Sequence, residues 1–162
     1  MGREQRGFSL IELLIVVAIV LILAAIAIPN FLRSRVAANQ ASAIESIRVI
    51  GTGEVTYATT YGTGYSTSLA YLGPPAPGQP ISSTAAGLVD DTLAAGGKSG
   101  YAFVYNATQF NAATQTWNGF SLQANPAAYG QSGGVYYYED QSFVIHANST
   151  TNATTTDIAV GD

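Results

Sequence analysis

An apolar stretch near the start of the chain limits what this sequence can fold into more than any other feature does. Residues 13–32 carry no charge, and residues 13–28 are all apolar. A helix of this length extends for about 30 Å, which matches the hydrocarbon core of a bilayer. Glu12 stands at the edge of the stretch, where an unpaired carboxylate is unfavourable, so we expect it to have a cationic partner.

Composition narrows the class of protein. The chain has 162 residues, enough for one globular domain and an anchor, and 10% of them are charged, with a net charge of −4. About a quarter are charged in a typical soluble domain, so this composition suits an exported domain that packs among copies of itself. The acidic balance argues against nucleic acid as a partner. The absence of cysteine excludes disulfides and Cys-ligated zinc, and it leaves the redox compartment undetermined.

Three interpretations of the N-terminus compete. In an ordinary signal peptide, residues 1–6 are the charged region and residues 25–27 (Ala-Ile-Ala) the cleavage site. A plain transmembrane anchor explains the length of the apolar stretch but not Glu12. The third interpretation depends on residues 7–12, where a glycine-phenylalanine pair comes directly before the apolar stretch and a glutamate follows.

Residues 7–12, Gly-Phe-Ser-Leu-Ile-Glu, resemble the processing site of type IV pilins and of the related pseudopilins of type II secretion systems. The resemblance implies that a prepilin peptidase cuts between Gly7 and Phe8 and that the new amine of Phe8 is methylated. Residues 1–7 are then a leader that is removed. Glycine before the cut lets the backbone approach a peptidase closely, because it has no side chain.

Cleavage changes the electrostatics around Glu12. It leaves four basic and nine acidic side chains, a net charge of −5, and creates an α-amine at Phe8 about one helical turn from Glu12. In the family this amine can belong to a neighbouring subunit. Two unit charges 4 Å apart interact by about 4 kcal/mol at an effective dielectric of 20, enough to favour one axial register between subunits. The alternatives are that Glu12 pairs with its own Phe8 amine or reaches the lipid headgroups.

The helical pattern continues beyond the apolar segment. We expect one helix over residues 8–60, with its apolar part at 8–32 and one buried face in its second half. The residues predicted for that face are Ala37, Ala41, Ile44, Ile47, Gly51, Val55 and Ala58. Pro29 is expected to kink the helix, and the alternative is a proline that a membrane helix tolerates.

The remainder of the chain predicts loops and then a sheet. Residues 61–97 are rich in turn residues, with one short helix from Ser83 or Thr84 to Ala95. Residues 98–162 contain four strand patterns, at 101–105, 117–124, 135–139 and 143–147. The predicted fold class is α+β: a long N-terminal helix packed against a four-stranded antiparallel sheet, the pilin fold.

Two segments of the sheet region, 98–103 and 136–145, resemble the sheets of bacterial pilins and major pseudopilins, more loosely than the N-terminus does. Phe143 stands where glycine is expected, and His146 where arginine is common. Some pilins close their C-terminal loop with a disulfide. Without cysteine, the loop must be held by something else, and we expect the sheet to hold it.

The sequence offers little chemistry for catalysis or cofactor binding. One histidine and no cysteine give no Cys/His nucleophile pair and no multi-histidine metal site, so we predict no enzyme, metal or cofactor. The adjacent acids at 90–91 and 139–140 are predicted to be solvated turn residues rather than a calcium site. Asn106, Asn148 and Asn152 fit the pattern of glycosylation acceptors, although chance matches are common in an Asn/Thr-rich tail.

The resemblance therefore implies a structural subunit of a type IV pilus, which passes from the bacterial inner membrane into a helical extracellular filament. Its implied partners are identical subunits, the prepilin peptidase, and an assembly machinery of platform, ATPase-driven motor and outer-membrane secretin. Adhesion, twitching motility, DNA uptake and surface attachment are not distinguished. The alternatives are a major pseudopilin of a type II secretion system, which stays in the periplasm, and a secreted domain behind an ordinary signal peptide.

Overall fold

The computed structural model describes residues 8–161 and divides the chain into two units, Met1–Arg35 and Val36–Asp162. Helix α1, Leu10–Tyr61, begins in the first unit and continues into the second. The long helix predicted over residues 8–60 is thus confirmed. The predicted leader at residues 1–7 lies outside the described residues.

Local chemistry accounts for the course of α1. The helix continues through Pro29, and the predicted kink at this residue stays a prediction. The helix ends where Gly62 adopts a left-handed φ of 66° and its N–H donates to the carbonyl of Ala58 at 3.0 Å. Glycine takes this conformation without steric penalty, which is why it commonly ends helices.

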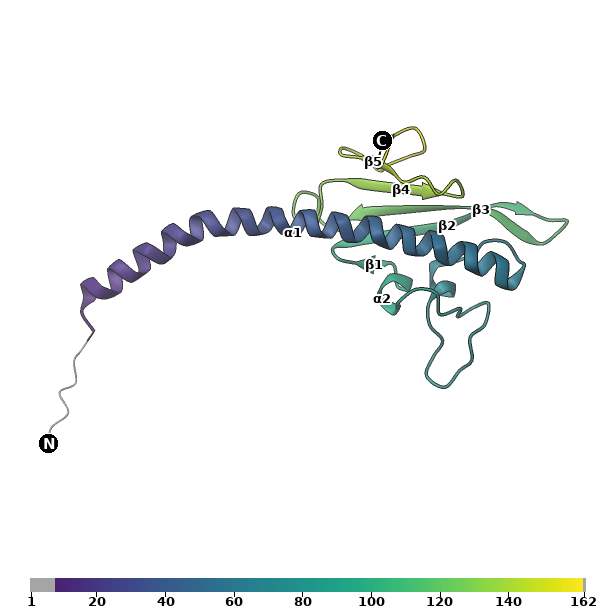
Figure 1. Ribbon diagram of the computed structural model, residues 1–162, viewed down its shortest axis with the longest axis horizontal. Helices are drawn as coiled ribbons and strands as arrows, with labels where there is room; N and C mark the ends of the chain where they lie inside the picture. The colour runs from purple at the N-terminus through teal and green to yellow at the C-terminus, as the bar shows by residue number, and fades with distance from the viewer. Residues whose placement is uncertain (1–7, 162) are drawn as a thin grey trace. The chain divides into compact units, whose positions relative to one another are not determined.

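The second unit is built on a six-stranded sheet, shown in green to yellow in Figure 1. The strands lie in chain order, and every neighbouring pair is antiparallel. They are β1 (Gly97–Lys98), β2 (Tyr101–Asn111), β3 (Thr116–Pro126), β4 (Tyr136–Asp140), β5 (His146–Asn148) and β6 (Ile158–Ala159).

The prediction of four strands was wrong in number, although the antiparallel meander was correct. Two of the six strands, β1 and β6, have two residues each, too few for any periodic pattern to show. Strand β2 continues to Asn111, well beyond its predicted end, because residues 106–111 pair with β3 in one long hairpin. Strand β5 begins at His146 rather than at residue 143.

Phe143 explains the late start of β5. Its φ of 58° is left-handed, which is unfavourable for a residue with a side chain by about 1–2 kcal/mol. The ring centroid of Phe143 lies 5.8 Å from that of Phe120 and 6.4 Å from that of Tyr65. Packing of the aromatic ring therefore offsets a backbone conformation that favours glycine, the residue expected at this position.

The segment between α1 and the sheet contains a 3₁₀ helix, η1 (Leu69–Leu72), and one helical turn, α2 (Asp91–Ala94). The helix predicted from Ser83 or Thr84 was wrong in its start. Backbone hydrogen bonds tie residues 86–89 to residues 71–73, so they cannot form a helical ladder. Helix α2 begins only after Asp90, whose Oδ1 accepts a hydrogen bond from the N–H of Leu93 at 2.8 Å.

The buried face of α1 differs from the predicted one. Only Ile47 and Gly51 of the predicted face are buried. The buried residues are Ala43, Ser46, Ile47, Ile50, Gly51, Gly53, Glu54 and Tyr57. Glu54 and Tyr57, which the predicted face did not include, are buried because the folded unit supplies hydrogen-bond partners for their polar groups.

The core of the second unit lies between this face of α1 and the sheet, which α1 crosses in Figure 1. Ile47 and Ile50 of the helix are fully buried in the same cluster as Phe120 and Leu122 of β3. The coarse prediction of a long helix packed against an antiparallel sheet is confirmed.

Two glycines on the buried face give a matched test of this packing. A Cβ at Gly53 would meet Leu88, Leu72 and Val89 at 3.6–3.7 Å, an ordinary contact distance. We expect Gly53→Ala to stabilise the unit by about 1 kcal/mol and raise its melting temperature by roughly 3–5 °C, because alanine favours the helix.

Gly51→Ala is the control for that prediction. A Cβ there would stand 3.0 Å from Oε2 of Glu139 and 3.2 Å from the ring of Phe143, so crowding removes part or all of the gain. Equal increases in melting temperature for the two variants, measured by circular dichroism, would contradict the close approach at Gly51.

Candidate functional site

In the first unit, residues 8–35 include a helix whose apolar surface is not covered by any of these residues. Phe8 is 74% exposed, and the large apolar side chains that follow it up to Leu32 are exposed as well. Among the described residues, α1 is the only helix long and apolar enough to cross a membrane, and none of its most apolar segment is buried. A helix that is apolar all round is stable in lipid or among other helices, not in water.

Glu12 stabilises the start of this helix. The N–H of Ser9, the residue before α1, donates to Oε2 of Glu12 at 3.2 Å, and the N–H of Leu13 donates to the carbonyl of Ser9 at 3.2 Å. A glutamate that reaches back to the N-cap amide is one half of a capping box. The signal for it, Ser-x-x-Glu, was present in the sequence at residues 9–12 and was missed, because Glu12 was considered only as an ion-pair partner.

The position of Glu12 leaves room for a second role. A carboxylate has two oxygens and accepts several hydrogen bonds, so a cap on one oxygen does not exclude a cation at the other. Phe8, whose amine would be that cation, is the first described residue. Gly7, the other residue of the predicted cleavage site, lies outside the described residues.

Comparison with known proteins identifies the segment. Residues 2–28 match the family model of the prokaryotic N-terminal methylation motif. The chain carries an N-terminal methylation motif. This motif covers the charged residues at the start of the chain, the glycine-phenylalanine pair and most of the apolar stretch, and it confirms the resemblance drawn from residues 7–12.

Two relatives share this methylation motif region. The type IV major pilin protein PilA of Myxococcus xanthus is 48% identical over 54 residues, 33% of this chain and 24% of that protein. The type IV wide pilus major component PilA4 of Thermus thermophilus is 62% identical over 37 residues, 23% of this chain and 28% of that protein. The chain thus spans about a quarter of the length of the curated relatives it matches. No solved structure matches the chain.

The C-terminal loop is held by hydrogen bonds around Asp157, together with the pairing of β5 and β6. One oxygen of Asp157 accepts from Nδ2 of Asn148 at 2.8 Å, and the other from the N–H of Thr154 at 2.7 Å. These bonds, led by the one from Thr154, keep the pKa of Asp157 below its usual range. The register His146↔Ala159 continues the sheet into the tail, which bears out the prediction that the sheet holds this loop.

The three candidate glycosylation acceptors lie in different settings. Asn106 is an exposed residue within β2 and pairs with Ser121 of β3. The amide of Asn148 is engaged on both sides, since its oxygen accepts from the N–H of Thr150 at 2.9 Å while its nitrogen donates to Asp157. Asn152 is exposed in the loop after β5. Glycosylation stays a prediction, and Asn152 is the acceptor that is both exposed and outside a strand.

The two pairs of adjacent acids behave differently from one another. Asp90 caps α2 and pairs with Nζ of Lys98 at 2.6 Å, and this contact holds the pKa of Asp90 well below its usual range. Glu139 is 2% exposed, so the prediction that it is a solvated turn residue was wrong. Because β4 side chains alternate, Glu139 faces the core while Asp140 lies on the other face. Within the described residues, no cluster of three acids or histidines could hold a metal.

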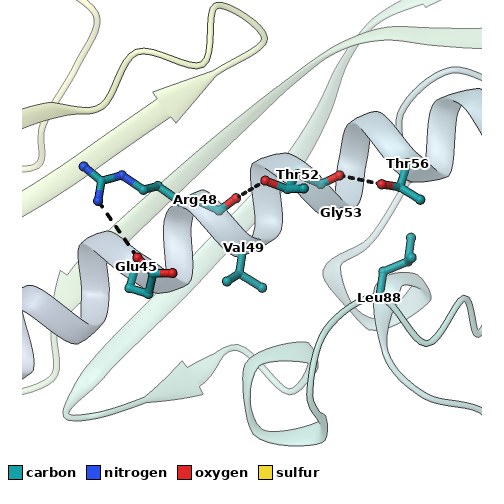
Figure 2. Close-up of a pocket in the computed structure, with 7 residues that line it drawn as sticks. All are labelled: Glu45, Arg48, Val49, Thr52, Gly53, Thr56 and Leu88. Atoms are coloured by element: carbon teal, nitrogen blue, oxygen red, sulfur yellow. Dashed lines mark hydrogen bonds and ion pairs between the residues drawn. The ribbon is translucent and has the colours of Figure 1, made fainter.

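A shallow groove follows the outer side of α1 between Glu45 and Thr56, shown in Figure 2. The hydroxyls of Thr52 and Thr56 donate to carbonyls of their own helix, each at 2.9 Å. Arg48 lies 3.9 Å from Glu45 in an exposed ion pair. These polar groups are engaged within α1, so the groove shows no arrangement suited to a reaction.

Two carboxyl groups are buried in the second unit, that of Glu54 on α1 and that of Glu139 on β4. Glu54 accepts from the N–H of Ser66 at 2.8 Å and from its hydroxyl at 2.5 Å, which ties the loop after α1 to the helix. Burial raises the pKa of Glu54, although the Ser66 hydrogen bonds act in the opposite direction. Burial, helped by the neighbouring Asp140, raises the pKa of Glu139 to about 8, while Arg48 acts to lower it.

The pKa of Glu139 predicts a pH dependence of stability. An acid with a pKa near 4.5 when unfolded and about 8 when folded makes its most favourable contribution below pH 4.5, and that contribution is lost as the pH rises to about 8. The loss is on the order of 3–5 kcal/mol. Glu139→Gln should therefore stabilise the folded chain at pH 7–8 and flatten the decline of its melting temperature between pH 5 and pH 8.

Asp91→Asn, which removes an exposed carboxylate of the same unit, serves as the control. Glu54 contributes a decline of the same sign, so a smaller slope should remain in Glu139→Gln. If the slope in Glu139→Gln equals that of the unmodified chain, Glu139 does not titrate as its burial requires.

Proposed function

We propose that this chain is a structural subunit of a type IV pilus, which assembles through its N-terminal helix into a helical extracellular filament. The observation that carries the proposal is the methylation motif joined to an apolar helix that residues 8–161 leave uncovered. Both matched relatives are named as major pilus components. Before assembly the same helix holds the subunit in the inner membrane, since lipid is the other environment that suits its surface.

Processing would occur between Gly7 and Phe8, followed by methylation of the Phe8 amine. The domain boundaries proposed with it are a leader at 1–7, a long helix at 8–60, a loop region at 61–97 and a sheet with tail at 98–162. A prepilin peptidase would make the cut, and a platform, an ATPase-driven motor and an outer-membrane secretin would handle the mature subunit. No catalytic role is proposed for the chain itself.

Glu12 would serve two purposes in this scheme. The described contact with Ser9 starts the helix, and the free amine created at Phe8 supplies a positive charge close to the same carboxylate. In a filament, the amine of a neighbouring subunit would pair with Glu12 and fix the axial register of the helices. The pair would lie among apolar side chains, where an unmatched charge is unfavourable, so slipped registers are disfavoured.

Mass spectrometry of the mature protein tests the processing step. A chain that starts at Phe8 with a methylated amine supports the proposal. A chain that starts at Ile28 would show an ordinary signal peptide and refute it. Images of purified filaments then distinguish a pilin from a pseudopilin. Long surface fibres made mainly of this chain indicate a pilus, whereas a short periplasmic assembly indicates a pseudopilus.

Variants of Glu12 separate its two proposed roles. Glutamine keeps the hydrogen bond to the Ser9 amide, because a capping box accepts Glu or Gln, but it removes the charge. We expect Glu12→Gln to insert into the membrane and be processed normally, yet to lower the yield of sheared filaments as severely as Glu12→Ala. Filament yields near normal in Glu12→Gln, with a loss in Glu12→Ala alone, would assign Glu12 to capping and refute the register role.

A further inference from the structure

Glu139 carries a buried carboxylate oxygen that lacks a partner within residues 8–161. Its Oε2 atom makes no hydrogen bond in this part of the chain, and the side chain is 2% exposed. The carboxyl lies against the backbone of α1, where a Cβ on Gly51 would stand 3.0 Å from Oε2. Buried carboxylates normally have partners, because they have lost their hydration. The single chain therefore leaves this group incomplete.

A cavity of about 440 Å³ lies beside this carboxyl group. Phe143, Val144, Ile145 and Val160 give it apolar walls, and Arg48 and Glu139 are the charged residues that line it. Val144 is 41% exposed, so the cavity is reached from the surface. Apolar walls next to a carboxylate suit a long basic side chain, since its aliphatic stem covers the walls while its cation meets the acid.

The chain has few cations that could fill this cavity. After residue 7, the basic side chains are Arg33, Arg35, Arg48 and Lys98. Lys98 already pairs with Asp90 at 2.6 Å. Arg48 is directed toward Glu45, as Figure 2 shows, and lies 3.9 Å from it.

Arg33 and Arg35 remain. Both are exposed, and neither forms an ion pair within the described part of the chain. Their guanidinium groups are permanently charged and donate several hydrogen bonds in a plane, which suits pairing with a buried carboxylate. One chain thus presents two guanidinium groups without an ion pair and one buried carboxyl group without a partner, within residues 8–161.

We propose that Glu139 and its cavity receive an arginine, Arg33 or Arg35, from a second copy of this chain. The inference rests on the proposed function, because it requires copies to come into contact. It goes beyond that function by naming a second charge contact between subunits, outside the N-terminal methylation motif. The partner copy completes a site that is incomplete in the single chain.

The proposal predicts opposite effects of one substitution on the subunit and on the filament. Glu139→Gln removes a buried carboxyl group, so the detergent-solubilised full-length subunit should melt at an equal or higher temperature at pH 7. The same substitution removes the negative charge that would pair with the partner's arginine. Truncating one member of a buried ion pair weakens association markedly, so filaments should release at least about tenfold more free subunit at equilibrium.

Arginine variants identify the donor. One of Arg33→Gln and Arg35→Gln should reproduce the filament loss of Glu139→Gln, and combining it with Glu139→Gln should add little further loss. Lys98→Gln is the matched control, because its cation pairs within its own chain, and its filaments should dissociate as those of the unmodified protein do.

Cross-linking tests the contact directly, since the chain has no cysteine of its own. Val144→Cys is co-expressed with Arg33→Cys or with Arg35→Cys, and a disulfide that links one chain of each variant joins the cavity to the basic pair. Each variant expressed alone shows any disulfide between identical positions. We expect a disulfide-linked dimer for one of the two combinations. Val104→Cys, 45% exposed on β2, replaces Val144→Cys in the control and should give none.

The outcomes separate this inference from the proposed function. The specific dimer without any filament would support the contact and refute the pilus. Filaments without the specific dimer, or filaments of Glu139→Gln as stable as those of the unmodified protein, would overturn the contact and leave the pilus standing. Dimers of equal yield with Val104→Cys would also overturn the contact. If neither filaments nor the specific dimer form, both proposals are overturned.

Discussion

The rest of this structure depends on one constraint: the apolar surface of the first part of α1 cannot remain in water. Between Phe8 and Leu32 its large side chains are exposed, and the described part of the first unit offers nothing to cover them. Burial of apolar surface contributes about 25 cal/mol per Å², so a surface of this size is strongly driven into lipid or against other helices. Membrane insertion and filament assembly are two ways to satisfy the same demand.

The second unit buries apolar side chains in a core of its own, and two carboxyl groups are buried with them. Glu54 lies fully buried on α1, where hydrogen bonds from Ser66 compensate part of its desolvation. Glu139 approaches the helix at Gly51, a position with no side chain, and has no comparable donors. Glu54 is thus satisfied within the chain, whereas Oε2 of Glu139 has no hydrogen-bond partner among the described residues, which is why we propose one from a second copy.

The sequence predicted the parts of the fold that depend on strong local patterns. The long helix, the end of the helical pattern near residue 61 and the antiparallel meander follow from hydrophobic periodicity and turn residues. The glycine expected at position 143 corresponds to a left-handed backbone that Phe143 adopts. The errors arose where tertiary contacts decide: the start of α2, the two-residue strands and the buried face of α1.

By itself, the sequence determined the N-terminal methylation motif and the apolar helix, because both are contiguous patterns whose chemistry needs no distant residue. Only the tertiary structure decided that Asp157 holds the C-terminal loop and that Glu139 is buried beside a cavity. The physical reason is that burial and hydrogen bonding belong to the surroundings of a side chain. Those surroundings are assembled from segments far apart in the chain, which no local pattern reports.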